Sequence, residues 1–515
     1  MTRTSVVEAA LTVAVVGLAL CGDGPTPAAA RGPRLDFLMP MKRPGIKMKM
    51  NLQAINKYFA ELENQKFNKA VRDYEFPTSG TEEGVTFVGI KVSQMHRFQI
   101  SRRPSEPNFL TWRIRNGHVT FKGFWQAYKT MLSGLQVPDS GDLIIKVRRM
   151  NSEIKTKLEW TEPAMQVNIS MVDEEPECSL KTVEVTLKPG VNGVLYPNST
   201  NENATLAMID SFRELYCNMS LEFFKEKILS HYQEALPLVQ SELGMTFDQS
   251  VLAQPVCTSR GIEIHYGGEW LGSDIVPSVR FFPVEMNFPK NFNYGNVKLL
   301  ISQDVLYTYY KQAFKRGTYK GKATYVEKRK STHYWQVSPR EDGKTSFGDD
   351  FPSIAADYLD WTPQMFVSMI GPPIIEFKEG RSKSSYKALY NVTLNMRLRR
   401  SRGVYLNTKV LEVIMIEGAS FRPLVTNPQK SPRFGGTTHG RSLKIMRFLP
   451  EVRDEFEAEK LARVAQRTID RYITPKIRRG MPIPLFPPKM TYEHTKLKTK
   501  DKYVVIGGNL YYPPI

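Results

Sequence analysis

The sequence predicts an α+β protein built from two similar halves that are joined by a proline-rich connector. Each half contains an amphipathic helical stretch, then short strands with alternating apolar and polar residues, and then a second amphipathic helix. The connector, residues 275–289, contains Pro277, Pro283 and Pro289, which exclude a helix and disfavour a central strand. At 515 residues the chain is long enough for two domains with separate cores.

In the first half, residues 45–50 alternate apolar residues with lysines, which predicts a short, half-buried strand. Asn51 then provides a cap for a long helix, and residues 85–188 read as short strands of a sheet with one dry and one wet face. A second helix is expected at residues 206–239. The apolar residues of the first helix are Leu52, Ile55, Phe59 and Leu62.

The second half repeats this order. Ser302 caps a helix that contains Val305, Leu306, Tyr309 and Phe314. The strict alternation of residues 387–399 predicts a strand, residues 451–473 predict a long helix, and the last segment reads as one or two strands. The apolar side of the long helix is expected to carry Val452, Phe456, Leu461, Val464 and Ile469.

The N-terminal segment has the features of a signal peptide. Residues 9–20 form an apolar run too short to span a bilayer, and Ala28 and Ala30 suit signal peptidase. We expect residues 1–30 to be removed and the mature protein, beginning at Arg31, to be secreted. Cleavage nearer Gly22 is one alternative, and an uncleaved anchor or buried segment is the other.

Secretion gives the cysteines a specific meaning. Once Cys21 is removed, Cys178, Cys217 and Cys257 remain, and in an oxidising compartment one pair is expected to form a disulfide bond. The sequence alone does not decide which pair. Zinc is not expected, because no two cysteines or histidines stand at ligand spacing. The glycosylation sequons are Asn168, Asn198, Asn203, Asn218 and Asn391, of which we expect two or three to be used.

The positive charge is concentrated in the second half. Residues 31–270 contain 29 Lys and Arg against 28 Asp and Glu, whereas residues 271–515 contain 41 against 22. Such a surface favours anionic partners, including phospholipid headgroups, glycosaminoglycans or nucleic acid, and a solvated basic face is the alternative.

Four features occur in one order along the mature chain: GIKMKMNLQAINKYF near its start, the cysteines at 178 and 217, the proline-rich connector, and the ending GMPIPLFPP…YVVIGGNLYY. Together they resemble the family of the bactericidal/permeability-increasing protein, lipopolysaccharide-binding protein, phospholipid transfer protein and cholesteryl ester transfer protein. The resemblance implies an elongated boomerang of two barrels, each a twisted antiparallel sheet around a long helix, joined by a central sheet. It also implies a disulfide bond between Cys178 and Cys217, with Cys257 outside the pattern, and a phospholipid in each barrel.

The domain boundaries follow from this resemblance. They are a signal peptide at 1–30, an N-terminal lipid-binding barrel at 31–270, a linker at 271–294, a C-terminal lipid-binding barrel at 295–486, and strands at 487–515 that return to the central sheet.

The candidate binding residues follow from combining the apolar helix faces with the resemblance. Acidic residues at 61, 63, 73 and 75 surround some of the lysines that are candidates for contacting an anionic headgroup, and this argues against strong binding of endotoxin at those lysines. The candidates for lining the acyl-chain pockets are Phe59, Leu62, Phe224 and Ile228 in the first half, and Val305, Tyr309, Phe456 and Val464 in the second. The candidate contacts to an anionic headgroup are Lys66, Lys69, Lys122 and Lys129.

The function expected is that of a secreted protein that binds phospholipid-like acyl chains and carries or transfers them. An innate-immune protein that binds lipopolysaccharide is the alternative, with an anionic membrane surface as a further partner. An enzyme is not expected, because the sequence has no GxSxG, HExxH, P-loop or GxGxxG pattern. No cofactor other than bound lipid and no nucleic-acid partner is expected, and the oligomeric state stays open.

Overall fold

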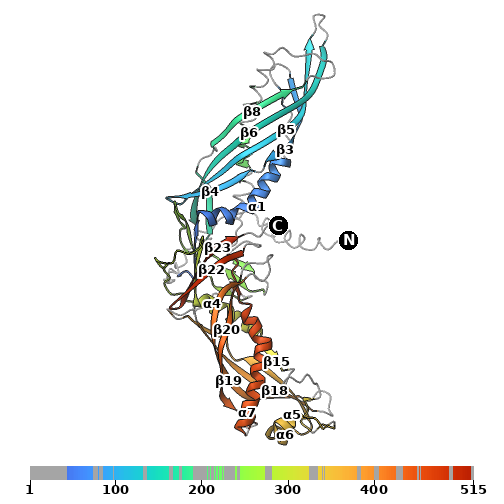
Figure 1. Ribbon diagram of the computed structural model, residues 1–515, viewed down its shortest axis with the longest axis vertical. Helices are drawn as coiled ribbons and strands as arrows, with labels where there is room; N and C mark the ends of the chain where they lie inside the picture. The colour runs from blue at the N-terminus through green and yellow to red at the C-terminus, as the bar shows by residue number, and fades with distance from the viewer. Residues whose placement is uncertain are drawn as a thin grey trace, which may run out of the picture. The chain divides into compact units, whose positions relative to one another are not determined.

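Strand β1, Ile46–Asn51, lies inside a six-stranded sheet of the computed structural model and pairs with a strand on each side. Figure 1 shows the course of the chain from its beginning in blue to its end in red. Ile46, Met48 and Met50 are buried, whereas Lys49 is exposed. This confirms the predicted alternation. The sheet order is β11-β12-β1-β14-β23-β22, so strands from the beginning, middle and end of the sequence lie side by side. We call this the central sheet.

The structure describes much of the chain between residues 43 and 511. The described residues are 43–73, 79–80, 85–96, 98–130, 136–161, 166–172, 177–188, 206, 209, 214, 216–218, 220–222, 224–225, 238–240, 244–272, 281–323, 334–338, 340–341, 343–377, 379, 384–398, 405–424, 433–448, 452, 454–485 and 491–511. The predicted signal peptide therefore lies outside the described residues.

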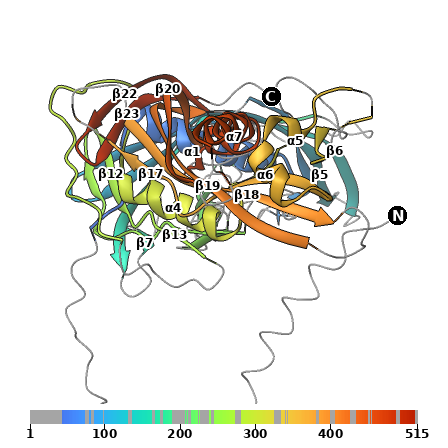
Figure 2. The same cartoon turned by 90° about the horizontal axis from the view of Figure 1, so that it is seen from below.

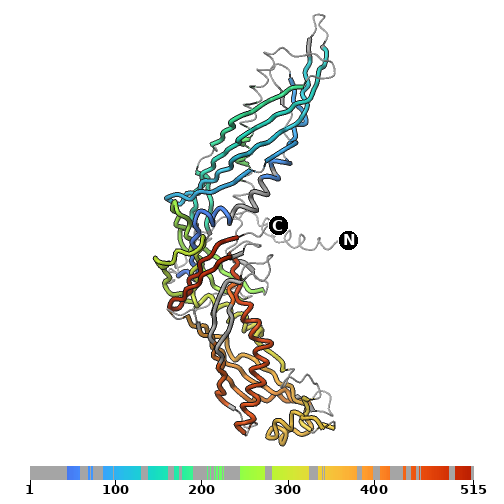
Figure 3. Tube along the Cα trace, viewed as in Figure 1, coloured from blue at the N-terminus to red at the C-terminus, as the bar shows by residue number. Residues whose placement is uncertain are grey.

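Four sheets hold the described strands, and Figure 3 follows their order along the chain. The central sheet contains β1, β11 (Val256–Thr258), β12 (Gly261–Tyr266), β14 (Val297–Ser302), β22 (Thr491–Lys500) and β23 (Tyr503–Tyr511). The first-half sheet contains β2 (Ser79–Gly80), β3 (Val85–His96), β4 (Gln99–Ser105), β5 (Phe109–Thr130), β6 (Gln136–Thr161), β7 (Gln166–Met171) and β8 (Glu177–Leu187). A small sheet contains β9 (Leu238–Gln240), β10 (Thr246–Asp248) and β13 (Trp270–Leu271). The second-half sheet contains β15 (Lys320–Lys322), β16 (Trp361–Met369), β17 (Ile374–Glu376), β18 (Ser384–Leu398), β19 (Tyr405–Leu424), β20 (Arg433–Phe448) and β21 (Met481–Pro482).

Helices accompany the two large sheets. They are α1 (Leu52–Asp73), α4 (Gln303–Lys315), α5 (Phe347–Asp350), α6 (Pro352–Asp357), α7 (Glu455–Thr468), the π-helical turn η4 (Ile469–Ile473) and α8 (Thr474–Arg478). Helix α1 contacts β3 and β4, and α7 contacts β16, β19 and β20. Figure 2 shows α7 beside β18 and β19. The described residues between 206 and 222 are also helical, as predicted for the second helix of the first half.

The predicted caps and periodicities are confirmed at several elements. The Asn51 side chain accepts a hydrogen bond from the Ala54 amide at 2.9 Å, and the Ser302 hydroxyl accepts one from the Asp304 amide at 3.2 Å. In β18 the buried residues alternate with half-buried and exposed ones. These buried residues are Tyr386, Ala388, Tyr390, Val392, Leu394 and Met396.

Three features differ from the predictions. Of the short strands expected between residues 85 and 188, those over residues 109–130 are one long strand, β5, whose pairing with β6 shifts register near Gly117. The helix expected to be continuous over 451–473 begins at Glu455 and changes to a π-helical turn after Thr468, and α8 then begins at Thr474 with Pro475 in its first turn. Leu52 is 39% exposed because it starts the first turn of α1, and Ala54 and Ile55 supply the buried face there instead.

The fold class is α+β, with more strand than helix. Within the described residues the two large sheets are open. The end strands β2 and β7 each pair with one neighbour, as do β15 and β21. No described helix is both long enough and apolar enough to cross a bilayer.

Candidate functional site

The predicted acyl-chain residues of the first half are placed only in part. Phe224 is buried, and its ring meets that of Trp112 edge-on, with centroids 5.2 Å apart. The indole of Trp112, on β5, donates to the hydroxyl of Thr156, on β6, at 2.9 Å. This bond orients the Trp112 ring against Phe224. The side chains of Phe59, Leu62 and Ile228 lie outside the described residues.

In the second half, Val305 and Tyr309 follow one another on the buried face of α4, and Val464 is buried on α7. All three belong to the main hydrophobic core. Phe456 does not join them, because its side chain is 62% exposed. The helix begins at Glu455 with Asp454 as its cap, and this turns Phe456 outward and Glu457 inward. The expectation that Phe456 lies on the apolar face is therefore wrong.

The four lysines proposed to contact a headgroup do not form one described cluster. Lys69 is exposed on α1, and Lys122 is exposed on β5, where it lies opposite Lys91 of β3. The side chains of Lys66 and Lys129 lie outside the described residues.

The cysteines are placed as three thiols. Cys178 of β8 lies within hydrogen-bonding reach of Cys217, and burial followed by this neighbour raises the pKa of Cys178. A disulfide bond between these two residues stays a prediction. Cys257 is buried on β11, and burial raises its pKa to about 12.

The sequon asparagines differ in their surroundings. Asn391 lies in the middle of β18, opposite Ser368 on one side and Glu412 on the other, and its Oδ1 atom is buried. Asn168 lies on the end strand β7, and Asn218 is exposed. Asn198 and Asn203 lie outside the described residues.

Asn391 is half-buried between Ser368 and Glu412, so we expect a glycan there to be disfavoured, because the sugar would compete for space with these side chains. We expect glycopeptide mapping of the protein expressed in a glycosylating cell to find Asn391 unmodified, whatever the occupancy of Asn218. A glycan on Asn391 of the folded, secreted protein would contradict this expectation.

An open pocket of about 870 Å³ lies where three segments meet at the beginning of α1. This volume is within the usual range for small-molecule and cofactor sites. The segments are the first turns of α1, the start of β4 and the turn between β11 and β12. The lining residues are Asn51, Leu52, Gln53, Asn56, Lys57, Gln99, Ile100, Ser101, Ser259 and Arg260. We call this the α1 pocket.

Side-chain hydrogen bonds hold the walls of the α1 pocket together. The Asn56 amide group donates to the Leu52 carbonyl at 3.1 Å and accepts from the Arg102 backbone amide at 2.6 Å. One residue therefore ties the first turns of α1 to β4. Further along the helix, the Asn68 side chain accepts from the Phe98 amide at 2.9 Å.

The third wall depends on a glycine. Gly261 pairs with Asn51 of β1 and has a φ of 157°. A Cβ atom there would stand 2.0 Å from the Met50 carbonyl oxygen, so only glycine allows this approach. The Thr258 hydroxyl accepts from the Arg260 amide at 3.3 Å, and this turn places Arg260 at the pocket.

The lining surface of the α1 pocket is mainly apolar, and the polar side chains at the pocket suit a group with negative charge. Lys57 and Arg260 supply two cations, and the amides of Gln53, Asn56 and Gln99 supply neutral donors and acceptors. Leu52 and Ile100 add apolar surface. None of these residues was a candidate from the sequence, since the pocket joins segments that lie far apart in the chain.

Within the described residues no group of three or more His, Cys, Asp and Glu side chains is arranged to hold a metal ion. The absence of a cofactor and of catalysis stays a prediction from the sequence.

Comparison with known proteins gives a likeness at the level of fold. The chain is similar to the crystal structure of a lipopolysaccharide binding protein, with a TM-score of 0.53 and 13% sequence identity over 92% of this chain and 100% of that chain. It also aligns with P47 of Clostridium botulinum A2, with a TM-score of 0.20 and 11% identity over 91% of this chain and 98% of that one. No family model and no curated protein matches the chain. The described architecture therefore resembles that of the lipopolysaccharide binding protein.

Proposed function

We propose that this protein is secreted, binds phospholipid-like lipids by their acyl chains, and carries or transfers them without covalent chemistry. The observation that supports this function is the likeness of fold to a lipopolysaccharide binding protein over 92% of the chain. A protein of that description binds an amphipathic lipid.

The proposed arrangement is one elongated barrel-like unit in each half, with acyl chains between a long helix and its sheet. In the first half α1 lies against β3 and β4, and in the second α7 lies against β19 and β20. Burial of a hydrocarbon chain contributes about 0.8 kcal/mol per CH₂ group, so an acyl chain supplies most of its own binding free energy. Phe224, Val305, Tyr309 and Val464 are the described residues that would contact it.

The α1 pocket is the proposed position of the lipid headgroup in the first half. Its two cations and its amide groups match a phosphate and the polar atoms around it. Ile100, which lines the pocket, is also part of the buried core, so the pocket borders the region where an acyl chain would lie.

The first test is mass spectrometry of lipid that co-purifies with the secreted protein, followed by replacement of both pocket cations, Lys57→Gln and Arg260→Gln. We expect phospholipid in the parent protein, and about tenfold weaker binding of an anionic phospholipid in the double variant, because two charge-assisted contacts are lost. Lys155→Gln with Lys181→Gln, two exposed lysines on β6 and β8, is the matched control.

Two results would overturn the proposal. Protein that carries no lipid and takes none from vesicles would exclude lipid carriage. Equal binding by the pocket variant and the control would exclude the α1 pocket as the headgroup site. Lipid carriage itself would then be tested separately, by transfer of phospholipid between vesicles.

An innate-immune protein that binds lipopolysaccharide is the second candidate, and the description of the similar structure favours it. Replacement of Lys66, Lys69, Lys122 and Lys129 by alanine separates the two functions. A lipopolysaccharide binder would lose affinity for endotoxin in this variant, whereas a phospholipid carrier would transfer phospholipid between vesicles as before.

A further inference from the structure

The face of the central sheet that points away from the main core carries a group of lysines. Met48, Leu299 and Ile506 belong to the main core, so their neighbours in sequence point to the opposite face. That face presents Lys47, Lys49, Lys298, Lys496 and Lys498. The α1 pocket uses none of them.

Strand register places three of these lysines in one line. Lys49 of β1 lies opposite Lys298 of β14, Lys298 lies opposite Gly507 of β23, and Gly507 lies opposite Lys496 of β22. Neighbouring strands are about 4.8 Å apart, so the line extends over about 15 Å. We call Lys49, Lys298 and Lys496 the lysine row.

Residues 281–294, the described end of the proline-rich connector, cross this face, and we call them the strap. Met286 of the strap forms a small buried cluster with Leu300 and Val505 of the sheet. A Cβ atom on Gly507 would stand 2.5 Å from the Tyr294 carbonyl oxygen, so the glycine lets the strap lie directly on the sheet.

The strap also orients each lysine of the row. The Lys49 ammonium lies 5.7 Å from the centre of the Phe288 ring, and the Lys496 ammonium lies 4.4 Å from that of Tyr294. The Lys298 Nζ atom donates to the Asn293 side-chain oxygen at 3.2 Å. The three ammonium groups are therefore held in place before any partner arrives.

This arrangement places positive charges directly opposite one another. Lys49 and Lys298 lie directly opposite one another, which destabilises a sheet, and burial followed by the Lys49 charge lowers the pKa of Lys298. Glu263 compensates Lys49 in part, at 3.4 Å, and Glu379 forms an ion pair with Lys500 beyond the row. An anionic partner would remove the remaining repulsion.

Protection of a sheet edge does not explain the lysine row. Lysines on an edge strand discourage pairing with other chains, and this suffices for Lys496 because β22 is the last strand of the central sheet. It does not account for Lys49 and Lys298, because β1 and β14 lie inside the sheet.

We propose that the lysine row and its neighbours Lys47 and Lys498 bind a linear sulfated polysaccharide. A stiff chain with regularly spaced anions matches lysines that stand in one line across the sheet and are oriented by the strap, and its binding gains from that geometry. A fluid membrane surface needs no such alignment, since its headgroups rearrange around any cluster of lysines.

The test uses heparin as the probe and the full-length secreted protein. The variant is Lys49→Gln, Lys298→Gln and Lys496→Gln together, and the control is Lys181→Gln, Lys387→Gln and Lys444→Gln, three exposed lysines of the other two large sheets. We expect the row variant to bind heparin oligosaccharides about a hundredfold more weakly at about 0.1 M salt, and the control to change less than threefold. The single variant Lys496→Gln, at an exposed position, should bind heparin oligosaccharides about fivefold more weakly. It replaces the triple variant in the test if the triple variant does not fold.

Equal losses in the two triple variants would show that net charge alone attracts heparin, and this would overturn the proposal. So would unchanged heparin binding in a folded row variant, or a loss confined to vesicles that contain anionic phospholipid. Lipid that co-purifies with the row variant is measured in parallel and is expected to be unchanged, so failure of this site is distinguishable from failure of lipid carriage.

Discussion

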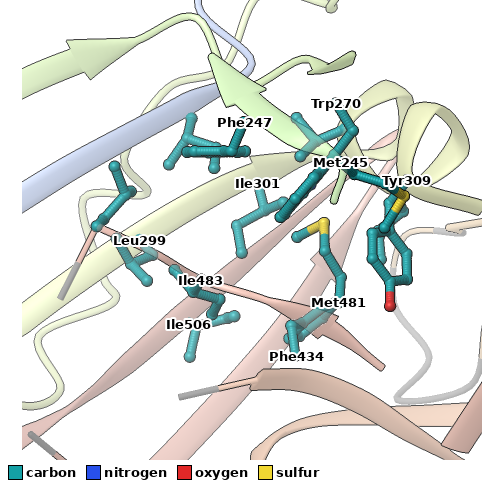
Figure 4. Packing of buried hydrophobic residues seen from close by; sticks show 14 of the residues in the cluster. Met245, Phe247, Trp270, Leu299, Ile301, Tyr309, Phe434, Met481, Ile483 and Ile506 are labelled. Atoms are coloured by element: carbon teal, nitrogen blue, oxygen red, sulfur yellow. The ribbon is translucent and has the colours of Figure 1, made fainter. Parts of the chain in front are cut away.

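Replacement of Trp270 by alanine is expected to lower the free energy of unfolding by about 3–5 kcal/mol. Trp270 is fully buried on β13, and its ring lies 4.9 Å from that of Phe247 on β10 and 5.3 Å from that of Tyr309 on α4 (Figure 4). Its backbone amide also donates to the Thr308 hydroxyl at 3.2 Å. The indole therefore joins the small sheet to the helix that follows the central sheet, and its loss leaves a large cavity between them.

The measurement is unfolding in urea. If the dependence of the unfolding free energy on urea concentration keeps its slope, the shift of the midpoint reports the change in stability. Phe456→Ala is the control, because this large aromatic side chain is 62% exposed and should change stability by less than about 0.5 kcal/mol. Trp270→Phe should fall between the two. Similar losses for Trp270→Ala and Phe456→Ala would contradict the described packing of both residues.

Local signals predicted the individual elements well. The caps at Asn51 and Ser302 lie where short polar side chains precede apolar periodicity, and the hydrogen bonds that define them are made within three residues. The alternation in β1 and β18 was equally readable, because each strand has one face on the core. Helix caps and strand alternation depend on residues that are close together in the sequence, so the sequence alone is enough to predict them.

Phe456 shows where residue identity misleads. Apolar character placed it on the inner face of α7, yet the inner position in that turn belongs to Glu457, which is buried. The Glu457 carboxylate accepts from the Ser353 backbone amide at 2.9 Å and from the Ser353 hydroxyl. A carboxylate with such partners tolerates burial, but the partner lies about a hundred residues earlier in the sequence, where no local pattern reveals it.

The α1 pocket could not be predicted for a related reason. Its walls come from residues 51–57, 99–101 and 259–260, which meet because β1 pairs with β12 and because Asn56 bonds to β4. The sequence contained one usable sign, a glycine directly after Arg260. Its role becomes clear only when Met50 is seen beside it.

The interior of the second half contains tyrosine hydroxyls among its apolar side chains, and this leads to the second large effect. Tyr310, Tyr319 and Tyr386 are all buried, and burial is the main cause that raises the pKa of each. The charge of Arg433 opposes the shift for Tyr310, and neighbouring tyrosines add to it for all three.

Each of these hydroxyls is neutral in the folded protein and ionises more easily after unfolding. A raised folded-state pKa means that the stabilisation is complete below the unfolded value, about 10, and is lost as the pH rises above it. Three such groups together lower the free energy of unfolding by about 4 kcal/mol at about pH 11, which is comparable with the total stability of many domains. We therefore expect cooperative alkaline unfolding in which tyrosinate absorbance and the loss of near-ultraviolet circular dichroism coincide.

Tyr386→Phe removes one of these three groups and should lessen the loss of stability at about pH 11 by about 1.4 kcal/mol. Tyr128→Phe, at a tyrosine that is 67% exposed, is the matched control and should leave that dependence unchanged. If every tyrosine ionised near pH 10 while the tertiary circular dichroism persisted, water would have access to this interior in the folded state. Acyl chains could then not be held there away from solvent, so the same titration also tests the dry interior on which the proposed lipid binding depends.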